Sequence, residues 1–409
     1  MMVSAQRILA RCDALARCSE TPGALTRRYL TPQMRAANDL VLAWMQEAGM
    51  TARIDAIGNV CGRYEAMGPD APALLMGSHL DTVRDAGRYD GMLGVISAIE
   101  CVAALHARGK RLPFAVEVLG FADEEGVRFG STLIGSRAVA GTFKRETLDT
   151  VDAGGITLRD SLRDYGLDSA RVHEAARDRK AILAYVELHI EQGPVLESLH
   201  LPVGVVTAIN GATRYQIEIE GMAGHSGTVP MHLRRDALAA AAECVLAIEG
   251  RASSEPDLVA TVGKLEALPG AINVIPGKVR FTLDVRAPVD AQRQRAAQDM
   301  TDALSAICAS RGVTLAMTVL HENRIAGCAP WLMQQLDAAV TREGIKVHRL
   351  PSGAGHDGMA MQALCDIGML FVRCLRGISH NPAESVTPHD VEAGARVLLG
   401  FIENFQPCP

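Results

Sequence analysis

The alternation of apolar and polar positions predicts an α/β protein in which buried strands alternate with amphipathic helices. Helical spacing of apolar residues covers residues 2–18, 32–48, 92–107, 330–343 and 391–404. Apolar runs predict strands at residues 74–77, 114–121, 186–194, 346–350 and 369–372, and residues 51–65 predict a hairpin around Gly58-Asn59. This order predicts a central mixed sheet flanked by helices.

The pattern changes in the middle of the chain. Two helices are expected at residues 234–249 and 291–310, among strands at residues 214–220, 258–266, 278–286 and 314–320. The short strands alternate apolar with charged residues, which is typical of a sheet with one solvated face. We therefore predict a catalytic domain of residues 1–210 and 324–409, with an inserted α+β lid and dimerisation domain of residues 211–323.

Length and composition exclude several classes of protein. A chain of 409 residues is long enough for two domains. Its net charge of −6 argues against a nucleic-acid or anionic-membrane partner. It has neither the apolar run of roughly 20 residues that spans a bilayer nor a signal-peptide core. Its 10 cysteines form no Cys-x-x-Cys pair, so we expect reduced thiols and a cytoplasmic protein.

Polar side chains follow the predicted strands where the strands end, which is where α/β proteins place ligands. His79, Asp81 and Asp90 follow the first apolar strand. Taken alone, they fit a metal-ligand set and an ordinary loop with a helix-capping Asp90 equally well. Glu124 and Glu125 follow the next strand. This second polar cluster at a strand end favours a functional site over an ordinary loop.

A third strand carries Glu187, His189 and Glu191 at alternate positions, which places them on one face. Such a face is often merely solvated, but this one borders two acidic strand ends. His380 lies in a loop before the last helix. Imidazoles and carboxylates without cysteine suit Zn²⁺, Mn²⁺ or Co²⁺.

These residues can be divided into two ligand sets. If Asp90 bridges two ions, His79 and His189 complete the first set. Glu125 and His380 then complete the second, as in hydrolases whose two ions lie about 3.5–4 Å apart. In such a site Glu124 is left free to act as the general base, and Asp81 can hold the second ring nitrogen of His79.

Five motifs in this order resemble the M20-type metallopeptidase and amidohydrolase superfamily. They are Gly77-Ser78-His79-Leu80-Asp81-Thr82-Val83, Tyr89-Asp90-Gly91, Glu124-Glu125-Gly126, His189-Ile190-Glu191-Gln192-Gly193 and Gly377-Ile378-Ser379-His380-Asn381-Pro382. They are most similar to its ureido branch, which comprises allantoate amidohydrolases, N-carbamoyl-L-amino acid hydrolases and β-ureidopropionases. The resemblance implies this metal assignment, with two divalent ions per subunit, and a homodimer formed through the lid.

The resemblance also implies roles for residues that the spacing alone does not single out. His225, in Gly224-His225-Ser226, matches the lid histidine that stabilises the oxyanion from the partner subunit, although alone it would be a turn residue. The family's substrate-binding positions match Gln192, Asn273, Arg286, Gly355 and His356. Without the family match, Arg286 would be an exposed strand charge paired with Asp284. Ser226 and Asp85-Ala86-Gly87 depart from the family pattern, and Asp85 adds a negative charge near the expected metals.

The expected reaction is metal-dependent hydrolysis of the C–N bond of a small ureido acid. Allantoate, giving ureidoglycine, ammonia and carbon dioxide, comes first because residues 26–45 look more like allantoate amidohydrolases. An N-carbamoyl-L-amino acid hydrolase or β-ureidopropionase is the alternative, and an M20-type aminopeptidase or dipeptidase is a further one. His189 and Arg286 favour the ureido branch.

Overall fold

The larger of two compact units is built on a mixed sheet. The computed structural model describes residues 3–408, and this unit comprises those up to Thr207, Cys328–Leu350 and those from Ala354 onward. The strand order is β1-β2-β4-β3-β5-β16-β6: Thr51–Ile54, Val60–Tyr64, Ala115–Phe121, Ala73–His79, Ile182–Ile190, Ile367–Val372 and Val203–Ile209. β15 (Arg349–Ser352) pairs with β6. The central strands β4, β3, β5 and β16 run parallel, whereas the pairs β1–β2, β2–β4 and β16–β6 are antiparallel, which confirms the predicted mixed sheet.

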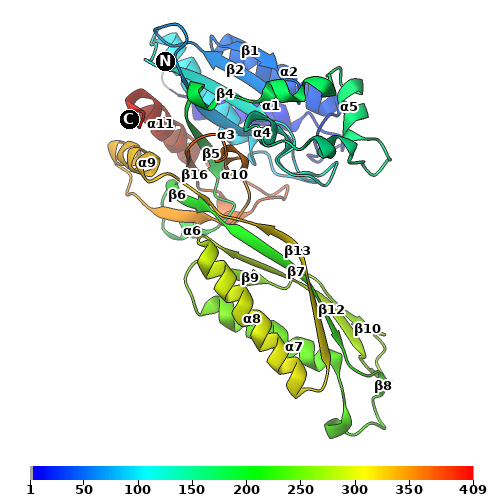
Figure 1. Ribbon diagram of the computed structural model, residues 1–409. Helices are drawn as coiled ribbons and strands as arrows, with labels where there is room; N and C mark the ends of the chain where they lie inside the picture. Colours follow the sequence, from blue (N-terminus) through cyan, green and yellow to red (C-terminus); the bar gives the residue numbers. More distant parts are fainter. Residues whose placement is uncertain (1–2, 409) are drawn as a thin grey trace. The chain divides into compact units, whose positions relative to one another are not determined.

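Five helices pack against one face of this sheet (Figure 1). They are α1 (Ala5–Ala16), α2 (Pro32–Glu47), α3 (Met92–Ala107), α9 (Pro330–Arg342) and α11 (Pro388–Asn404). α2 begins as its sequence indicates, because the Thr31 side chain accepts a hydrogen bond from Met34 N and Pro32 needs no donor at that position. Residue 2 of the first predicted helix lies outside the described residues.

The alternation of side chains along the parallel strands separates the core from the opposite face. Leu74 and Met76 of β3 and Leu188 of β5 belong to the core beneath the five helices. Because successive side chains point to opposite faces, His79 and His189 point away from that core. This face is buried as well, not solvated: His79 is 2% exposed and His189 1%.

The remaining elements of the larger unit are short. They are α4 (Ile134–Val139), α5 (Leu158–Asp164), α6 (Val195–Ser198), α10 (Gly358–Met361) and 3₁₀ segments at Arg145–Asp149, Ser169–Ala175, Arg179–Ala181 and Leu375–Gly377. Among residues 3–408, no helix is long and apolar enough to cross a bilayer.

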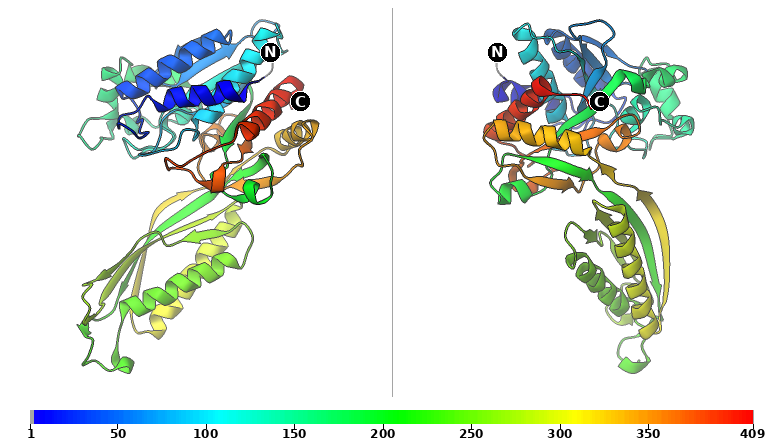
Figure 2. Two further views of the ribbon diagram at one scale, coloured as in Figure 1. Left: turned by 180° about the vertical axis from the view of Figure 1, so that it is seen from behind. Right: turned by 60° about the vertical axis from the view of Figure 1, so that its left-hand side comes forward.

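The second unit, Ala208–Gly327 with Pro351–Gly353, contains the predicted α+β segment. Its sheet order is β10-β12-β7-β13: Leu265–Leu268, Lys278–Ala287, Gly211–Glu220 and Thr314–Asn323, with β9 (Val259–Thr261) on β12. Helices α7 (Ala237–Ser253) and α8 (Asp290–Ser310) pack side by side against one face (Figure 2). β8 (Gly224–His225) pairs with β11 (Val274–Ile275), and β14 (Ala326–Gly327) pairs with Ala208 and Ile209; a 3₁₀ turn covers Met231–Leu233.

Three sequence predictions about strands were wrong, and one strand was missed. The strand predicted at residues 186–194 ends at Ile190, and Glu191 beyond it accepts hydrogen bonds from the Val195 and Leu196 amides at the start of α6. The strand predicted at residues 258–266 is two strands, β9 and β10. The strand predicted at residues 346–350 begins at Arg349, and β6 was not predicted.

Candidate metal centre

The parallel strands bring three polar clusters to one edge of the sheet. β3 ends at His79, β4 ends two residues before Asp123, and β5 ends just after His189. Because these neighbouring strands are parallel, their carboxyl ends lie together. Asp123 has a φ of +55°, so the chain turns sharply before Glu124 and Glu125. The fold therefore gathers residues that lie more than 100 positions apart.

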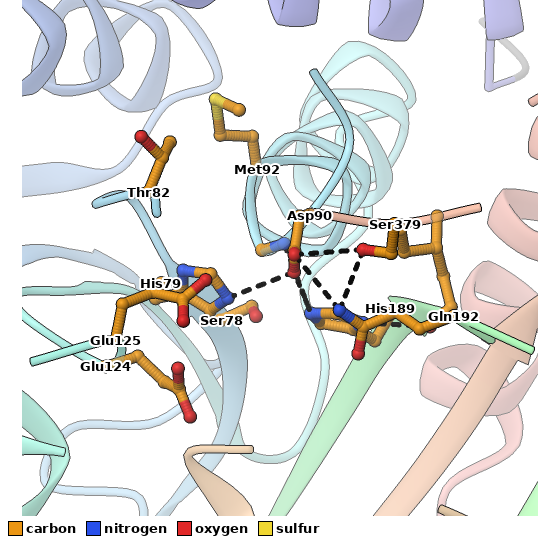
Figure 3. Close-up of polar contacts among 12 residues, drawn as sticks. Ser78, His79, Thr82, Asp90, Met92, Glu124, Glu125, His189, Gln192 and Ser379 are labelled. Atoms are coloured by element: carbon orange, nitrogen blue, oxygen red, sulfur yellow. Dashed lines mark hydrogen bonds and ion pairs between the residues drawn. The ribbon is translucent and has the colours of Figure 1, made fainter. Parts of the chain in front are cut away.

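Asp90, which precedes α3, belongs to two groups of possible metal ligands. Figure 3 shows it between His79 on one side and His189 on the other. Its Oδ1 is 3.5 Å from His79 Nε2 and 3.2 Å from His189 Nε2. Its Oδ2 is 3.1 Å from His380 Nε2, which is 3.5 Å from Glu125 Oε1. Within each group, the possible ligand atoms lie within 4.8 Å of one another.

The two buried histidines present their Nε2 atoms to this cluster. His79 Nδ1 is 3.0 Å from the Asp81 carbonyl oxygen, and His189 Nδ1 is 2.9 Å from that of Ile190. A carbonyl only accepts hydrogen bonds, so each ring carries its hydrogen on Nδ1. Nε2 of each ring then faces Asp90 and is the atom that would hold a cation once it is deprotonated, and His189 Nε2 also accepts a hydrogen bond from Gly91 N at 3.1 Å. These donors fit a metal site formed by imidazoles and carboxylates.

Asp81 contacts His79 through its main-chain carbonyl, and Glu124 and Glu125 through its side chain. Its carboxylate is 3.7 Å from His79 Nδ1, beyond a hydrogen bond, and its carbonyl makes that contact instead. The carboxylate oxygens accept hydrogen bonds from the Glu124 and Glu125 amides, at 2.9 and 3.1 Å. Asp81 thus connects the loop after β3 with the turn after β4.

Burial and, after it, the neighbouring charges shift the pKa values of this cluster. Burial alone would raise the pKa of Asp90, but contacts with His189, His380 and His79 hold it well below its usual range. Burial raises the pKa of Glu124 well above its usual range and that of Glu125 to about 7. A divalent cation would reverse these upward shifts, because it favours the ionised carboxylates.

Three predicted substrate-binding residues of the larger unit lie next to this cluster. Gln192 Nε2 donates to Asp90 Oδ2 at 3.0 Å. The His356 ring is 4.4 Å from that of His189, and burial followed by repulsion from His189 lowers the pKa of His356 well below its usual range. A Cβ at Gly355 would lie 3.7 Å from Glu124 Oε1.

The other predicted residues belong to the second unit. Pairing of β8 with β11 brings His225 beside Val274, and the Asn273 carbonyl accepts from Ser226 N at 3.0 Å. Arg286 donates to Asp284 at 2.8 and 3.2 Å and to the Gly353 carbonyl at 2.7 Å. Arg286 thus makes the ion pair with Asp284 that was the alternative to a substrate-binding role. The substrate roles of His225, Asn273 and Arg286 stay predictions.

Sequence reasoning missed a buried cation that supports the metal-binding loops. Arg27 is fully buried, and its Nε donates at 2.8 Å to the carbonyl of Leu80, between His79 and Asp81. Its main chain pairs with Thr82 through bonds of 2.9 and 3.0 Å. Burial lowers the pKa of this guanidinium to about 10. The only sequence signal is an arginine in a short polar stretch, which usually indicates a surface residue.

Two further missed residues lie in the loop that carries His380. Ser379 and Glu384 both contact the Asp90 segment, and Glu384 is 5% exposed. The motif around His380 includes Ser379, and Glu384 follows it by two residues, but nothing in the spacing distinguishes either from ordinary loop residues.

Comparison with known proteins is consistent with this site. The model of peptidase family M20/M25/M40 matches residues 75–404. Allantoate deiminase 1 of Glycine max is 41% identical, over 97% of this chain and 88% of the relative. An N-carbamoyl-L-amino acid amidohydrolase of Geobacillus stearothermophilus is 42% identical over 97% of both chains. The crystal structure of a hydantoinase/carbamoylase-family amidase from Burkholderia multivorans superposes with a TM-score of 0.93 at 34% identity, covering 100% of this chain and 99% of that one.

Proposed function

The chain belongs to peptidase family M20/M25/M40, and we propose that it is a metal-dependent amidohydrolase acting on a small ureido acid. The observation that carries this proposal is the buried cluster of histidines and carboxylates around Asp90. The donor types and their arrangement suit divalent cations, and relatives named for ureido substrates match nearly the whole chain.

We assign two divalent ions, Zn²⁺, Mn²⁺ or Co²⁺, to the two ligand groups. His79 and His189 would hold one together with Asp90, and Glu125 and His380 would hold the other, also with Asp90. The separation of the two groups onto different oxygens of one carboxylate supports a bridging role for Asp90. When bound, such ions make water more acidic and polarise the carbonyl that it attacks.

Glu124 moves the proton in this mechanism. It belongs to neither group around Asp90, yet it lies within reach of His79 and Glu125. It accepts a proton from the attacking water and returns it to the leaving nitrogen when the C–N bond breaks. One water is consumed for each carbamoyl group, which leaves as ammonia and carbon dioxide.

Allantoate is the proposed substrate, with ureidoglycine as the remaining product. The support is the 41% identity to a plant allantoate deiminase, together with the resemblance of residues 26–45 to allantoate amidohydrolases. An N-carbamoyl-L-amino acid is the second candidate, because a relative of that name is equally similar. Both substrates have a carbamoyl group and a carboxylate, and they differ in the remainder of the acid.

A direct comparison of substrates tests this proposal. Metal-free protein is reconstituted with Zn²⁺ or Mn²⁺, ammonia release is measured from allantoate and N-carbamoyl-L-amino acids, and amino acid release is measured from a dipeptide control. We expect release from allantoate at the highest kcat/KM. Turnover of N-carbamoyl amino acids alone would exclude allantoate and favour the second candidate. Hydrolysis of the dipeptide alone would contradict the ureido assignment.

We also propose a homodimer formed through the second unit, in a reducing compartment such as the cytoplasm. All ten cysteines are free thiols, which supports a reducing environment. Light scattering during size-exclusion chromatography measures the mass directly. A dimer is expected, and a monomer at the concentrations used for activity would contradict the proposed assembly.

A further inference from the structure

The loop of residues 378–384, which we call the His380 loop, contacts the Asp90 segment through three side chains. His380 Nε2 is 3.1 Å from Asp90 Oδ2, and Ser379 Oγ is 3.2 Å from the same oxygen. Glu384 Oε1 accepts hydrogen bonds from the main-chain amides of Tyr89 and Asp90, at 2.8 and 3.2 Å. Two of these three contacts come from residues that are not ligands.

The two ligand groups differ in what supports them. His79 and His189 lie on the central strands β3 and β5 and are almost completely buried. The His380 side chain is 50% exposed, and its residue has a φ of +53° in a loop outside the sheet. The group formed with His380 therefore depends on how firmly this loop is docked, whereas the two histidines of the other group are held by the sheet.

Glu384 is well suited to dock the loop. It is 5% exposed, and each of its oxygens has a partner: Oε1 binds the two amides, and Oε2 accepts from Ser379 Oγ at 3.0 Å. Gly87 leaves room for it, since a Cβ there would overlap the Cβ, Cδ and Oε1 atoms of Glu384. The absence of a side chain at Gly87 thus leaves space for this carboxylate beside the Asp90 segment.

Ser379 connects Glu384 with the bridging oxygen. Its hydroxyl accepts from Gln192 Nε2 at 2.9 Å and carries a single hydrogen, which can go either to Asp90 Oδ2 or to Glu384 Oε2. When the Ser379 hydroxyl donates this hydrogen to Glu384 Oε2, it does not donate it to Asp90 Oδ2. A lone pair of Asp90 Oδ2 is then free for a cation.

We infer that Glu384 and Ser379 are positioning residues that dock the His380 loop and thereby control binding of the ion held by Asp90, Glu125 and His380. This inference rests on the proposed two-ion site. The ion held by His79 and His189 shares only Asp90 with the loop, and both of its histidines lie on the sheet, so it should depend on the loop less. Loss of the docking contacts should therefore weaken one ion selectively, whereas general destabilisation would weaken both.

The test is calorimetric titration of metal-free, full-length protein with Zn²⁺, with bound zinc counted after gel filtration. His380→Ala identifies the binding class that belongs to the loop. Glu384→Ala and Ser379→Ala should weaken that class by about 10- to 100-fold and leave the other within about threefold, as expected when supporting contacts of metal ligands are lost. Gly87→Ala should have the same effect, although every ligand and Glu384 itself remain.

Two controls complete the design. Glu384→Gln keeps an oxygen for the Tyr89 and Asp90 amides, so it should weaken the loop class less than Glu384→Ala does. Glu392→Gln, an exposed carboxylate on α11, should change neither class. Equal weakening of both classes, or no change in Glu384→Ala and Ser379→Ala, would overturn the inference while leaving the two-ion site intact. Wild-type protein that binds a single zinc ion would contradict the two-ion site and the inference together.

Discussion

The close approach of helix α3 to the sheet gives a prediction that can be worked out from the structure. Gly94 packs against β5 so tightly that a Cβ would lie 3.0 Å from Ser78 Cβ and overlap the Leu188 carbonyl oxygen. These neighbours directly precede the ligands His79 and His189. The substitution Gly94→Ala therefore presses α3 against the part of the sheet that holds the metal centre.

Two opposing terms set the effect on stability. Alanine improves helix propensity by about 1 kcal/mol relative to glycine, whereas overpacking a core costs about 1–3 kcal/mol. To relieve the overlap with the Leu188 carbonyl oxygen, α3 must move away from β5 by roughly 1 Å. The close-packed interior leaves no void that could take up the added methyl group instead. Asp90 lies two residues before α3 and would move with it. Since ligand distances in metal sites tolerate only about 0.2 Å, we expect metal affinity to fall at least tenfold.

The matched control is Gly400→Ala on α11, where no atom lies within 4 Å of the added Cβ. There only the propensity gain applies, so unfolding free energy should rise by about 0.5–1 kcal/mol without a change in metal affinity. Urea unfolding and zinc titration of both variants measure these quantities. If Gly94→Ala and Gly400→Ala had the same unfolding free energy and the same zinc affinity, the packing argument would be refuted.

Three further predictions concern the cluster itself. Glu124→Gln should lower kcat by about 10²- to 10⁴-fold with unchanged zinc content, because it removes proton transfer and no ligand; unchanged kcat would exclude this role. Asp90→Ala should abolish both zinc binding and turnover, and metal analysis showing two retained ions would contradict its bridging role. Burial followed by repulsion from Asp90 raises the pKa of Glu384 from 4.5 to about 7, so the native state binds the extra proton between these values. Metal-free protein should therefore lose up to roughly 3 kcal/mol of unfolding free energy as pH rises from 4.5 to 7, in urea titrations, and Glu384→Gln should lose less.

The sequence is sufficient to predict the residues that gather at the strand ends. The strands ending near His79 and Phe121 are short apolar runs followed by polar residues, and parallel strands bring such ends together. Alternation also placed Glu187 and His189 on one face. It did not indicate that this face is buried, because burial depends on the covering elements and not on the strand's own pattern.

Contacts between distant segments could not be predicted in the same way. Glu384 binds amides almost 300 residues away, and Arg27 binds a loop about 50 residues away. No period in the sequence records such pairings. Glu191 shows a related limit: its place in an alternating pattern predicted a strand, but its carboxylate caps α6 because two helix amides there need acceptors.

The central claim is that Asp90 bridges two metal ions in a hydrolytic site. Anomalous diffraction from crystals of the zinc-loaded protein with a non-hydrolysable allantoate analogue tests it most directly. We predict two zinc peaks, one on each oxygen of Asp90, with the analogue's carbamoyl group beside them. A single peak, or zinc bound away from Asp90, would contradict the account.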